Sequence, residues 1–191
     1  MVATRNDHKL RELREILTSL ELIALPDEVE LPPEDGETFA DNALVKARTA
    51  RAATGLVAIA DDSGIEASGL GGRPGVRSAR YAGPAASDEE NLDRLLRELD
   101  GVEDRGVDYV CALAYVGGDG AERLFEGRCE GELAREPRGS GGFGYDPAFV
   151  PADTGTDDGR SMAELSTEEK HAISHRGRAA RALARWLEGG G

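Results

Sequence analysis

The segment Leu56-Val57-Ala58-Ile59-Ala60-Asp61-Asp62-Ser63-Gly64 indicates the fold class of this chain. Five consecutive apolar residues follow Gly55 and lead directly into two aspartates. A short, continuous apolar run bounded in this way is typical of a buried strand, and strands of α/β proteins have this pattern. We therefore predict a buried strand over residues 56–60 that ends at Asp61.

Helices are expected on both sides of this strand and at the end of the chain. Apolar residues recur at helical spacing over residues 9–20 and 175–187. Capping pairs predict three further helix starts, at Thr38 with Asp41, Ser87 with Glu90, and Ser166 with Glu169. The Thr38 helix is rich in alanine and is expected to run to residue 54, because Gly55 is a typical helix stop.

The second half of the chain has the pattern of antiparallel strands. Residues 107–116 and 122–133 are two strand-like runs, and the glycine-rich residues 117–120 between them predict a hairpin. Short strands are also expected at 1–3 and 22–25, and loops at 28–37, 69–75 and 138–146. These elements predict one α/β domain over residues 1–191, with a mixed sheet flanked by helices.

The charge of the chain excludes several classes of protein. There are 37 acidic and 23 basic residues, which gives a formal net charge of -14. Nucleic-acid binders usually carry a basic footprint, and anionic membranes attract basic segments. No apolar run approaches the roughly 18–20 residues of a membrane span, and the first residues lack a signal core. We therefore expect a cytoplasmic protein.

The two cysteines, Cys111 and Cys129, have neither the number nor the spacing of a disulfide framework or a metal site. We interpret them as small buried apolar residues.

Two acidic segments are candidates for a metal site. Asp61 and Asp62 follow a buried strand, where ligands bind in open α/β sheets, and carboxylate oxygens are ligands that Mg²⁺ prefers. The alternative is a plain Asp-Ser-Gly turn. Glu34 lies in the acidic loop 28–37 and could complete a carboxylate pair with Asp62 if the fold brings the two together.

Residues 4–9, Thr-Arg-Asn-Asp-His-Lys, are a candidate phosphate site. They precede a predicted helix, whose N-terminus presents free N–H groups and a positive dipole end. The Walker-type motif GxxxxGK[ST] is absent. The alternative interpretation is an ordinary helix N-cap.

Residues 141–147, Gly-Gly-Phe-Gly-Tyr-Asp-Pro, are a candidate site for a flat ring. Glycines permit close approach of the backbone to a ligand. Phe143 or Tyr145 could stack on a base, and Asp146 could accept hydrogen bonds from it. The alternative is a tight loop whose aromatic side chains pack into the core.

Basic residues gather at the start of the last predicted helix. Lys170, His171, His175 and Arg176 lie there, around Ser174, which has the character of a cap. Positive charge at a helix N-terminus opposes the macrodipole, so an anion or an acidic side chain is expected nearby. We reject a zinc site at His171 and His175, because the HExxH pattern is missing.

Six motifs, taken in order, resemble one known family. They are Thr-x-Asn-x-x-Lys (4–9), Glu-x-Gly-x-Thr-Phe-x-x-Asn-Ala (34–43), Ala-Asp-Asp-Ser-Gly (60–64), Leu-Gly-Gly-x-Pro-Gly-Val-x-Ser-Ala-Arg-Tyr (70–81), Gly-Gly-Phe-Gly-Tyr-Asp-Pro (141–147) and Glu-Lys-x-x-Ile-Ser-His-Arg-Gly (169–177). The set is similar to the inosine/xanthosine triphosphate pyrophosphatase family and spans nearly the whole chain.

The resemblance implies an activity and a fold. The reaction would be Mg²⁺-dependent hydrolysis of ITP, dITP or XTP to the monophosphate and pyrophosphate. The fold would be an elongated, two-lobed α/β body with its active-site cleft between the lobes, in a homodimer.

By motif match, Asp62 would be the general base and a metal ligand, and Glu34 the second metal ligand. The positions that would contact substrate are Thr4, Arg5, Asn6, Asp7, His8, Lys9, Lys46, Ser63, Phe143, Gly144, Tyr145, Asp146, Lys170, His175 and Arg176. His175, Arg176 or a backbone N–H would donate a hydrogen bond to the base carbonyl at position 6, which adenine lacks.

Two features qualify the resemblance. Arg5 stands where many relatives have a small residue, so it would either crowd the phosphate loop or add charge to it. Lysine is rare in this chain, and all three lysines, Lys9, Lys46 and Lys170, match substrate-contacting positions. A compact ammonium on a flexible stem is not interchangeable with a planar guanidinium at a phosphate site.

Three other interpretations remain at this point. A Maf-like pyrophosphatase has a related fold but prefers other nucleotides. A nucleotide-binding module without turnover would gain little from carboxylates at positions 34 and 62. A structural protein without a ligand is the third.

Overall fold

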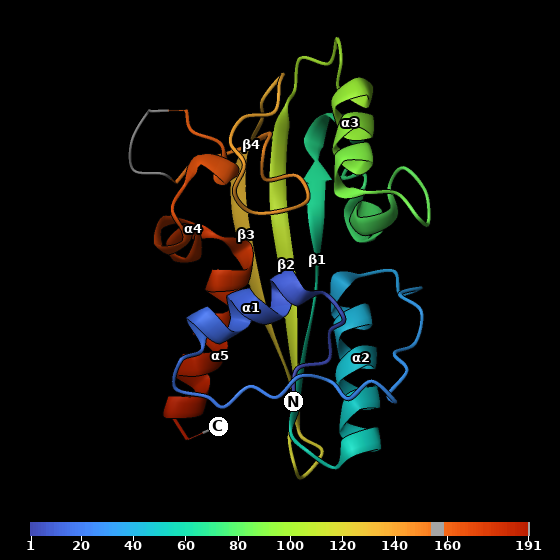
Figure 1. Ribbon diagram of the computed structural model, residues 1–191, viewed down its shortest axis with the longest axis vertical. Coiled ribbons are helices and arrows are strands. Elements are labelled where there is room, and N and C mark those ends of the chain that lie inside the picture. Colours follow the sequence, from blue (N-terminus) through green and yellow to red (C-terminus); the bar gives the residue numbers. More distant parts are fainter. Residues whose placement is uncertain (154–158, 191) are drawn as a thin grey trace. The chain divides into compact units, whose positions relative to one another are not determined.

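The computed structural model describes residues 1–153 and 159–190 (Figure 1). Its helices are α1 (Asp7–Ile16), α2 (Phe39–Thr54), α3 (Asp88–Glu98), α4 (Thr167–Ile173) and α5 (His175–Glu188). Its strands are β1 (Ala58–Ala67), β2 (Gly106–Val116), β3 (Glu122–Leu133) and β4 (Phe149–Pro151). Short 3₁₀ turns occupy Ser68–Leu70, Gly75–Arg80 and Met162–Glu164.

The sheet contains both kinds of strand pairing. Its strand order is β1-β2-β3-β4, and β3 pairs with β4 in the antiparallel sense, with Gly131 opposite Pro151. Val2 adds parallel bridges to Ala24 and to Ile59. The predicted α/β class with a mixed sheet is therefore confirmed.

Strand β1 corrects the predicted end of the apolar run. It covers Ala58–Ala67, so Asp61 and Asp62 lie inside the strand and not after it. Leu56 and Val57, predicted as strand residues, precede it and are 44% and 41% exposed. The strand continues through two acidic residues because cationic and amide side chains compensate them, as described below.

Most helix signals in the sequence are confirmed. The capping boxes at Thr38, Ser87 and Ser166 are all formed, and Gly55 ends α2 with φ +72°. Helix α5 agrees with the predicted range within one residue.

The N-terminal elements are shorter than predicted. Helix α1 begins at Asp7 and ends at Ile16, capped by Leu17, so it stops short of the predicted residue 20. The predicted strand at 22–25 is reduced to the single bridge at Ala24.

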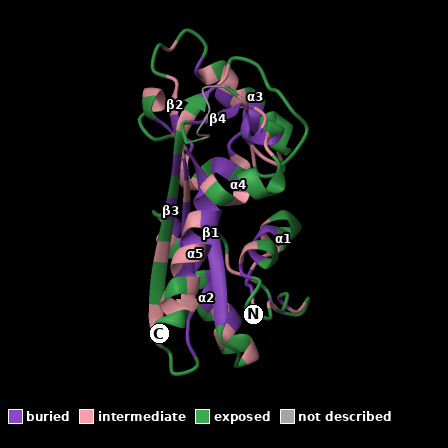
Figure 2. Ribbon diagram, turned by 90° about the vertical axis from the view of Figure 1, so that its left-hand side faces the viewer, coloured by how far each residue is buried: buried purple, intermediate pink, exposed green. Residues whose placement is uncertain are grey.

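The chain divides into two compact units. Unit 1 comprises Met1–Ser63, Cys111–Gly127 and Arg176–Gly191, and unit 2 comprises Gly64–Val110 and Arg128–His175. Strands β1, β2 and β3 each contribute residues to both units. Strand β1 is buried along most of its length, whereas β3 is largely exposed (Figure 2).

Each unit has its own apolar core. In unit 1, α1 and α5 pack on β1 and β2 through Val2, Leu13, Leu17, Ile59, Cys111, Leu113, Ala179, Ala180 and Leu183. In unit 2, side chains of α3 pack with aromatic residues such as Tyr109, Tyr145 and Phe149. Both cysteines are buried, as predicted. Among the described helices, none combines the length and apolar character needed to cross a bilayer.

Candidate functional site

The Asp61 cluster in unit 1 is a buried ion network made of Lys9, Glu12, Asp61, Ser63 and Arg176. Arg176 donates to Asp61 Oδ2 from Nε at 3.1 Å and from Nη2 at 2.9 Å, and Lys9 Nζ lies 3.2 Å from the same oxygen. Arg176 also donates to Glu12 Oε2 at 2.5 Å and to Ser63 Oγ at 2.8 Å. The sequence predicted an acidic partner near the start of the last helix, and the structure has two, Asp61 and Glu12.

This network keeps Asp61 ionised. Burial by itself raises the pKa of this fully buried carboxyl, but the charges of Lys9 and Arg176 outweigh it and hold the pKa well below its usual range. The Asp61 carboxylate is thus ion-paired with both Lys9 and Arg176, and Glu12 gives Arg176 a second anionic partner. The contacts of Arg176 go to Asp61, Glu12 and Ser63, so its guanidinium is a buried structural group as well as a predicted substrate contact.

The Asp62 cluster, also in unit 1, consists of Glu34, Asn42, Lys46 and Asp62. Helix α2 presents Asn42 and Lys46 one turn apart, so both side chains reach β1 on the same face. Asn42 Nδ2 donates to Asp62 Oδ2 at 2.9 Å, and Asn42 Oδ1 accepts from the Gly36 N–H at 2.8 Å. One buried amide therefore ties Asp62 to the loop that carries Glu34.

Lys46 lies between the two carboxylates of the Asp62 cluster. Its Nζ is 2.5 Å from Glu34 Oε1 and 3.5 Å from Asp62 Oδ1. Burial raises the pKa of Asp62, and Lys46 and Lys9 only partly oppose this effect. For Lys46, burial lowers the pKa, but the surrounding carboxylates outweigh it and the pKa is raised. The fold has brought Glu34 and Asp62 together, as the pair interpretation required.

The donor set at Glu34 and Asp62 fits a Mg²⁺ ion. Both carboxylate oxygens lie within 3.5 Å of one nitrogen, so a cation near that position could contact both. In residues 1–153 and 159–190, no three His, Cys, Asp or Glu side chains gather as a closed metal cage. Mg²⁺ commonly takes one or two protein carboxylates and fills its other positions with water and phosphate oxygens.

The loop 4–9 is in part the ordinary N-cap that was the alternative interpretation. Asn6 caps α1 and accepts from the N–H groups of His8 and Lys9 at 3.0 and 3.1 Å. The Thr4 hydroxyl accepts from the Asn6 N–H at 3.1 Å, and Asp7 is exposed in the first turn. Of this loop, Lys9 reaches the Asp61 cluster.

Arg5 neither crowds this loop nor leaves its charge there. Its guanidinium donates to the backbone carbonyls of Leu25, Pro26 and Val29 at 3.0, 2.6 and 2.7 Å. Arg5 therefore links the start of the chain to the segment that follows the Ala24 bridge.

The Asp146 cluster in unit 2 consists of Tyr109, Phe143, Asp146, Lys170 and His175. The buried Asp146 accepts from Tyr109 Oη at 3.0 Å, from the Phe143 N–H at 2.9 Å and from Lys170 Nζ at 2.7 Å. The Tyr109 ring stacks on His175, with centroids 4.5 Å apart and planes 4° apart. Burial, followed by the Asp146 charge, raises the pKa of Tyr109 well above its usual value, so the phenol stays a donor.

Backbone geometry explains the glycines beside Asp146. Gly142 has φ +71°, and a Cβ there would lie 2.0 Å from Asp146 Oδ2, so only glycine fits. Lys170 Nζ lies 5.0 Å from the centre of the Phe143 ring, within cation–π range. Tyr145, in contrast, packs in the unit 2 core and donates to the Ser78 carbonyl at 2.7 Å, as the core interpretation of this loop predicted.

Sequence reasoning gave no role to three residues in these clusters. Asn42 stands in a quoted motif, but nothing in its spacing showed which carboxylate it would bind. Glu12 follows Lys9 by one helical turn, a spacing that places both on one face of α1. Tyr109 lies in an apolar strand, where an aromatic residue is normally only a packing residue.

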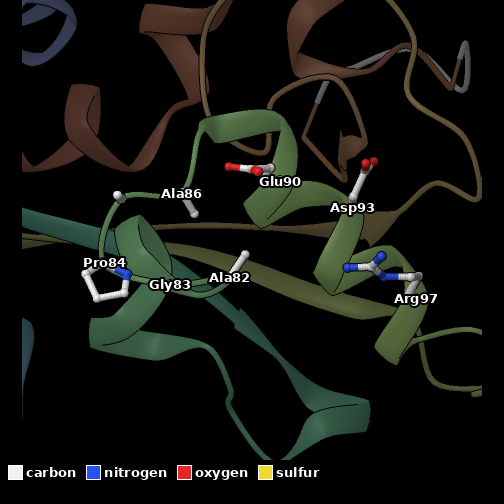
Figure 3. Close-up of a pocket in the computed structure, with 8 residues that line it drawn as sticks. Ala82, Gly83, Pro84, Ala86, Glu90, Asp93 and Arg97 are labelled. Atoms are coloured by element: carbon white, nitrogen blue, oxygen red, sulfur yellow. The ribbon is translucent and has the colours of Figure 1, made fainter.

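A separate hollow of about 500 Å³ occurs in unit 2 (Figure 3). The loop from Ala82 to Ala86 forms one side, and Glu90, Asp93 and Arg97 of α3 form the other. Glu90 already accepts from the Ser87 N–H in the capping box. None of the lining residues belongs to the three clusters.

Fold and clusters together define an α/β protein that surrounds buried carboxylates with lysine and arginine side chains. A model of the Ham1 family matches residues 1–186, and the chain belongs to this family. The family resemblance drawn from the six motifs is thereby confirmed.

Close relatives and solved structures agree with this assignment. A dITP/XTP pyrophosphatase of Mycobacterium tuberculosis is 52% identical over 188 residues, covering 94% of this chain and 90% of that protein. A HAM1 protein from Coxiella burnetii superposes with a TM-score of 0.86 at 42% identity, covering 98% of this chain and 96% of that chain. A nucleoside-triphosphatase / dITP/XTP pyrophosphatase from Mycobacterium abscessus gives 0.75 at 46% identity, covering 97% of each.

Proposed function

We propose that this chain is a hydrolase of acid anhydrides that cleaves the non-canonical purine triphosphates ITP, dITP and XTP. The products are the nucleoside monophosphate and pyrophosphate, so the reaction cleanses the nucleotide pool. The observation that carries the proposal is the Asp62 cluster, in which two carboxylates share one cation position. The relatives named dITP/XTP pyrophosphatase support the same substrate class.

In this proposal Asp62 is the catalytic residue, and it holds Mg²⁺ together with Glu34. Bound Mg²⁺ would neutralise phosphate oxygens and make an attacking water more acidic. Asp62 Oδ2 accepts from Asn42, which fixes the carboxylate plane. The carboxylate then takes the proton of the attacking water, in the manner of a general base.

The cationic side chains of unit 1 are assigned to the triphosphate. Lys9 and Lys46 stabilise the negative charge that develops on the leaving pyrophosphate. The loop residues Thr4, Arg5, Asn6, Asp7 and His8, together with Ser63, are the remaining proposed contacts of unit 1 with substrate. Arg5 contributes through its backbone, since its guanidinium donates to the carbonyls of Leu25, Pro26 and Val29. Arg176 belongs to this set through its bonds to Asp61 and Ser63.

The Asp146 cluster of unit 2 is assigned to the base. Phe143 supplies a ring for stacking, and Lys170, His175 or a backbone N–H supplies a donor to the carbonyl at position 6. The Gly144 N–H already donates to Asp88 Oδ2 at 2.8 Å, so it is not this donor. Tyr145 contributes through its backbone, since its side chain is part of the core. A site that donates to this carbonyl leaves the amine of adenine without a partner, which can discriminate steeply.

The proposal extends to the state of the protein. Residues 1–191 act as one pyrophosphatase domain, the chain forms a homodimer, and it works in the cytoplasm, where the free nucleotide pool is found. The substrate is a small molecule, and the net charge of -14 argues against nucleic acid or an anionic membrane as a partner.

A substrate panel tests the proposed function. Release of pyrophosphate is measured for dITP, ITP, XTP, dGTP, dATP, dCTP and dTTP, with Mg²⁺ and with excess chelator. We expect turnover of the first three only, and none with chelator. Guanine shares the carbonyl at position 6, so the rejection of dGTP requires that its 2-amino group is excluded separately. Equal turnover of dATP and dITP would contradict the base assignment, and preference for pyrimidine triphosphates would favour a Maf-like enzyme. Binding of these nucleotides without turnover would favour the interpretation as a nucleotide-binding module.

A further inference from the structure

We propose that Lys46 is an exchangeable counter-cation: it competes with the divalent cation for Glu34 and Asp62, and a bound cation turns its ammonium toward the triphosphate. This inference rests on the proposed function, because it assumes that Glu34 and Asp62 are the metal ligands.

The geometry places Lys46 in direct competition with a metal ion. Its Nζ is the cation that touches both Glu34 Oε1 and Asp62 Oδ1, at 2.5 and 3.5 Å. These are the two oxygens that the fit to Mg²⁺ requires. Asp62 Oδ2 is engaged by Asn42 at 2.9 Å, so it is not the oxygen that is open to exchange.

Because Lys46 and Asp62 are buried, the Lys46 ammonium can leave the carboxylates only if another cation takes its place. The side chains of Lys46 and Asp62 are each only 7% exposed, and that of Glu34 is 32% exposed. The buried Asp62 carboxylate requires a compensating cation, and the buried Lys46 ammonium requires an anion. When a dication takes the carboxylates, like-charge repulsion drives the ammonium from them, and it needs a new anionic partner. A triphosphate on the same cation provides one.

The side-chain chemistry of Lys46 suits this movement. Its backbone is fixed inside α2, while the ammonium is a point charge at the end of four methylene groups. Asn42, one turn earlier on the same face, keeps Asp62 in place through its own hydrogen bond and the bond to Gly36. The carboxylates can therefore exchange one cation for another without losing their positions.

A direct measurement of cation binding tests the inference without nucleotide. The probe is Mn²⁺, and free Mn²⁺ is counted by electron paramagnetic resonance during titration of the full chain. We expect Lys46→Met to bind Mn²⁺ at least about tenfold more tightly than the wild type, because a repelling charge next to the site has gone. The matched control is Arg48→Met, which removes the same charge from α2 at an exposed pair with Glu122 and should leave the affinity unchanged.

A third variant, Glu34→Gln, should weaken Mn²⁺ binding and so shows that the titration reports this site. Unchanged or weaker binding in Lys46→Met, with a lowered affinity in Glu34→Gln, would overturn the inference. Circular dichroism melting checks that each variant is folded, and Lys46→Gln replaces Lys46→Met if the methionine variant is not.

Hydrolysis of dITP supplies the second half of the test. At saturating Mg²⁺, Lys46→Met should have a kcat at least about tenfold lower, because the ammonium no longer reaches the phosphates. A variant that binds Mn²⁺ more tightly and turns over normally would contradict the transfer to the triphosphate. If the wild type does not hydrolyse dITP at all, the proposed function fails, whereas the competition is still judged by the Mn²⁺ titration.

Discussion

Unit 1 buries Asp61 and Asp62 beside Lys9, Lys46 and Arg176, whereas unit 2 buries Asp146 beside one lysine, a phenol and a backbone N–H. Asp61 and Asp62 have three cationic partners, whereas two of the three donors to Asp146 are neutral. Charged partners suit ligands whose charge changes during a reaction, such as phosphates with a metal ion. Fixed neutral donors suit a ligand that has only to be recognised.

The two units therefore differ in their proposed roles, because the reaction is assigned to unit 1 and recognition of the base to unit 2. They also differ in the groups that hold their buried carboxylates in place. The carboxylates of unit 1 form ion pairs with Lys9, Lys46 and Arg176, while Asp146 lies in a tight loop in which Gly142 leaves no space for a side chain. Substitutions in the two units should therefore affect different kinetic parameters. The following predictions, in order of decreasing effect, test that separation.

The largest effect is expected for Asp62→Asn in unit 1. Loss of a general base typically lowers kcat by about 10²–10⁴-fold, and the amide keeps the size of the side chain and can still accept from Asn42. Steady-state pyrophosphate release from dITP measures kcat, and a melting curve verifies the fold. The control is Asp93→Asn, an exposed acid of α3, which should behave as the wild type. A kcat within threefold of normal in Asp62→Asn would remove the catalytic assignment.

A smaller and different effect is expected for Asp146→Asn in unit 2. Hydrogen bonds to a charged group contribute about 1.5–3 kcal/mol, so loss of the carboxylate should raise KM for dITP by about 10–100-fold. The kcat should change much less, since no reacting atom is touched. Tyr109→Phe removes one of the three hydrogen bonds but keeps the ring, so its KM should rise only a few-fold. If Asp146→Asn lowered kcat as strongly as Asp62→Asn, the division of roles between the units would be wrong.

The smallest effect concerns stability in acid. The pKa of Asp61 is below the usual 3.8 in the folded chain, so its ionised form stabilises the fold above that pH. As the pH falls below about 3.8, the unfolded chain takes up a proton that the folded chain does not, and this stabilisation is lost. A loss of ~1 kcal/mol lowers Tm by about 2–4 °C for a domain of this size.

Thermal melting at pH 5 and pH 3 measures this acid effect. The decrease in Tm should be larger for the wild type than for Asp61→Asn, which has no carboxyl to titrate at this position. Equal decreases in the two proteins would show that the buried network of Asp61 does not set the acid stability of unit 1.

The sequence predicted a large part of the fold because many of its signals are local. The three capping boxes and Gly55 need only neighbouring residues, and all four are present in the structure. The end of β1 was predicted wrongly, because the compensation of Asp61 and Asp62 comes from α1, α2 and α5. Such long-range partners have no signature in the residues next to the aspartates.

The sequence predicted different parts of the candidate site in the two units. In unit 1 the charged residues could be named, but the position of Lys46 between Glu34 and Asp62 depends on how α2 lies against β1. In unit 2 the glycine-rich loop was found, while Tyr109 was not, because an aromatic residue in a buried strand looks like ordinary core. Arg5 shows the opposite case, in which a basic residue in a candidate phosphate loop holds backbone carbonyls.

The scarcity of lysine gives this chain an unusual practical property. Each of its three lysines contacts a different buried aspartate: Lys9 contacts Asp61, Lys46 contacts Asp62 and Lys170 contacts Asp146. Apart from the N-terminal amine, an amine-selective acylating reagent can therefore react only at these three clusters. Peptide mass spectrometry would measure the extent of acylation at each lysine separately. Each lysine therefore reports on one of the three clusters of the proposed site.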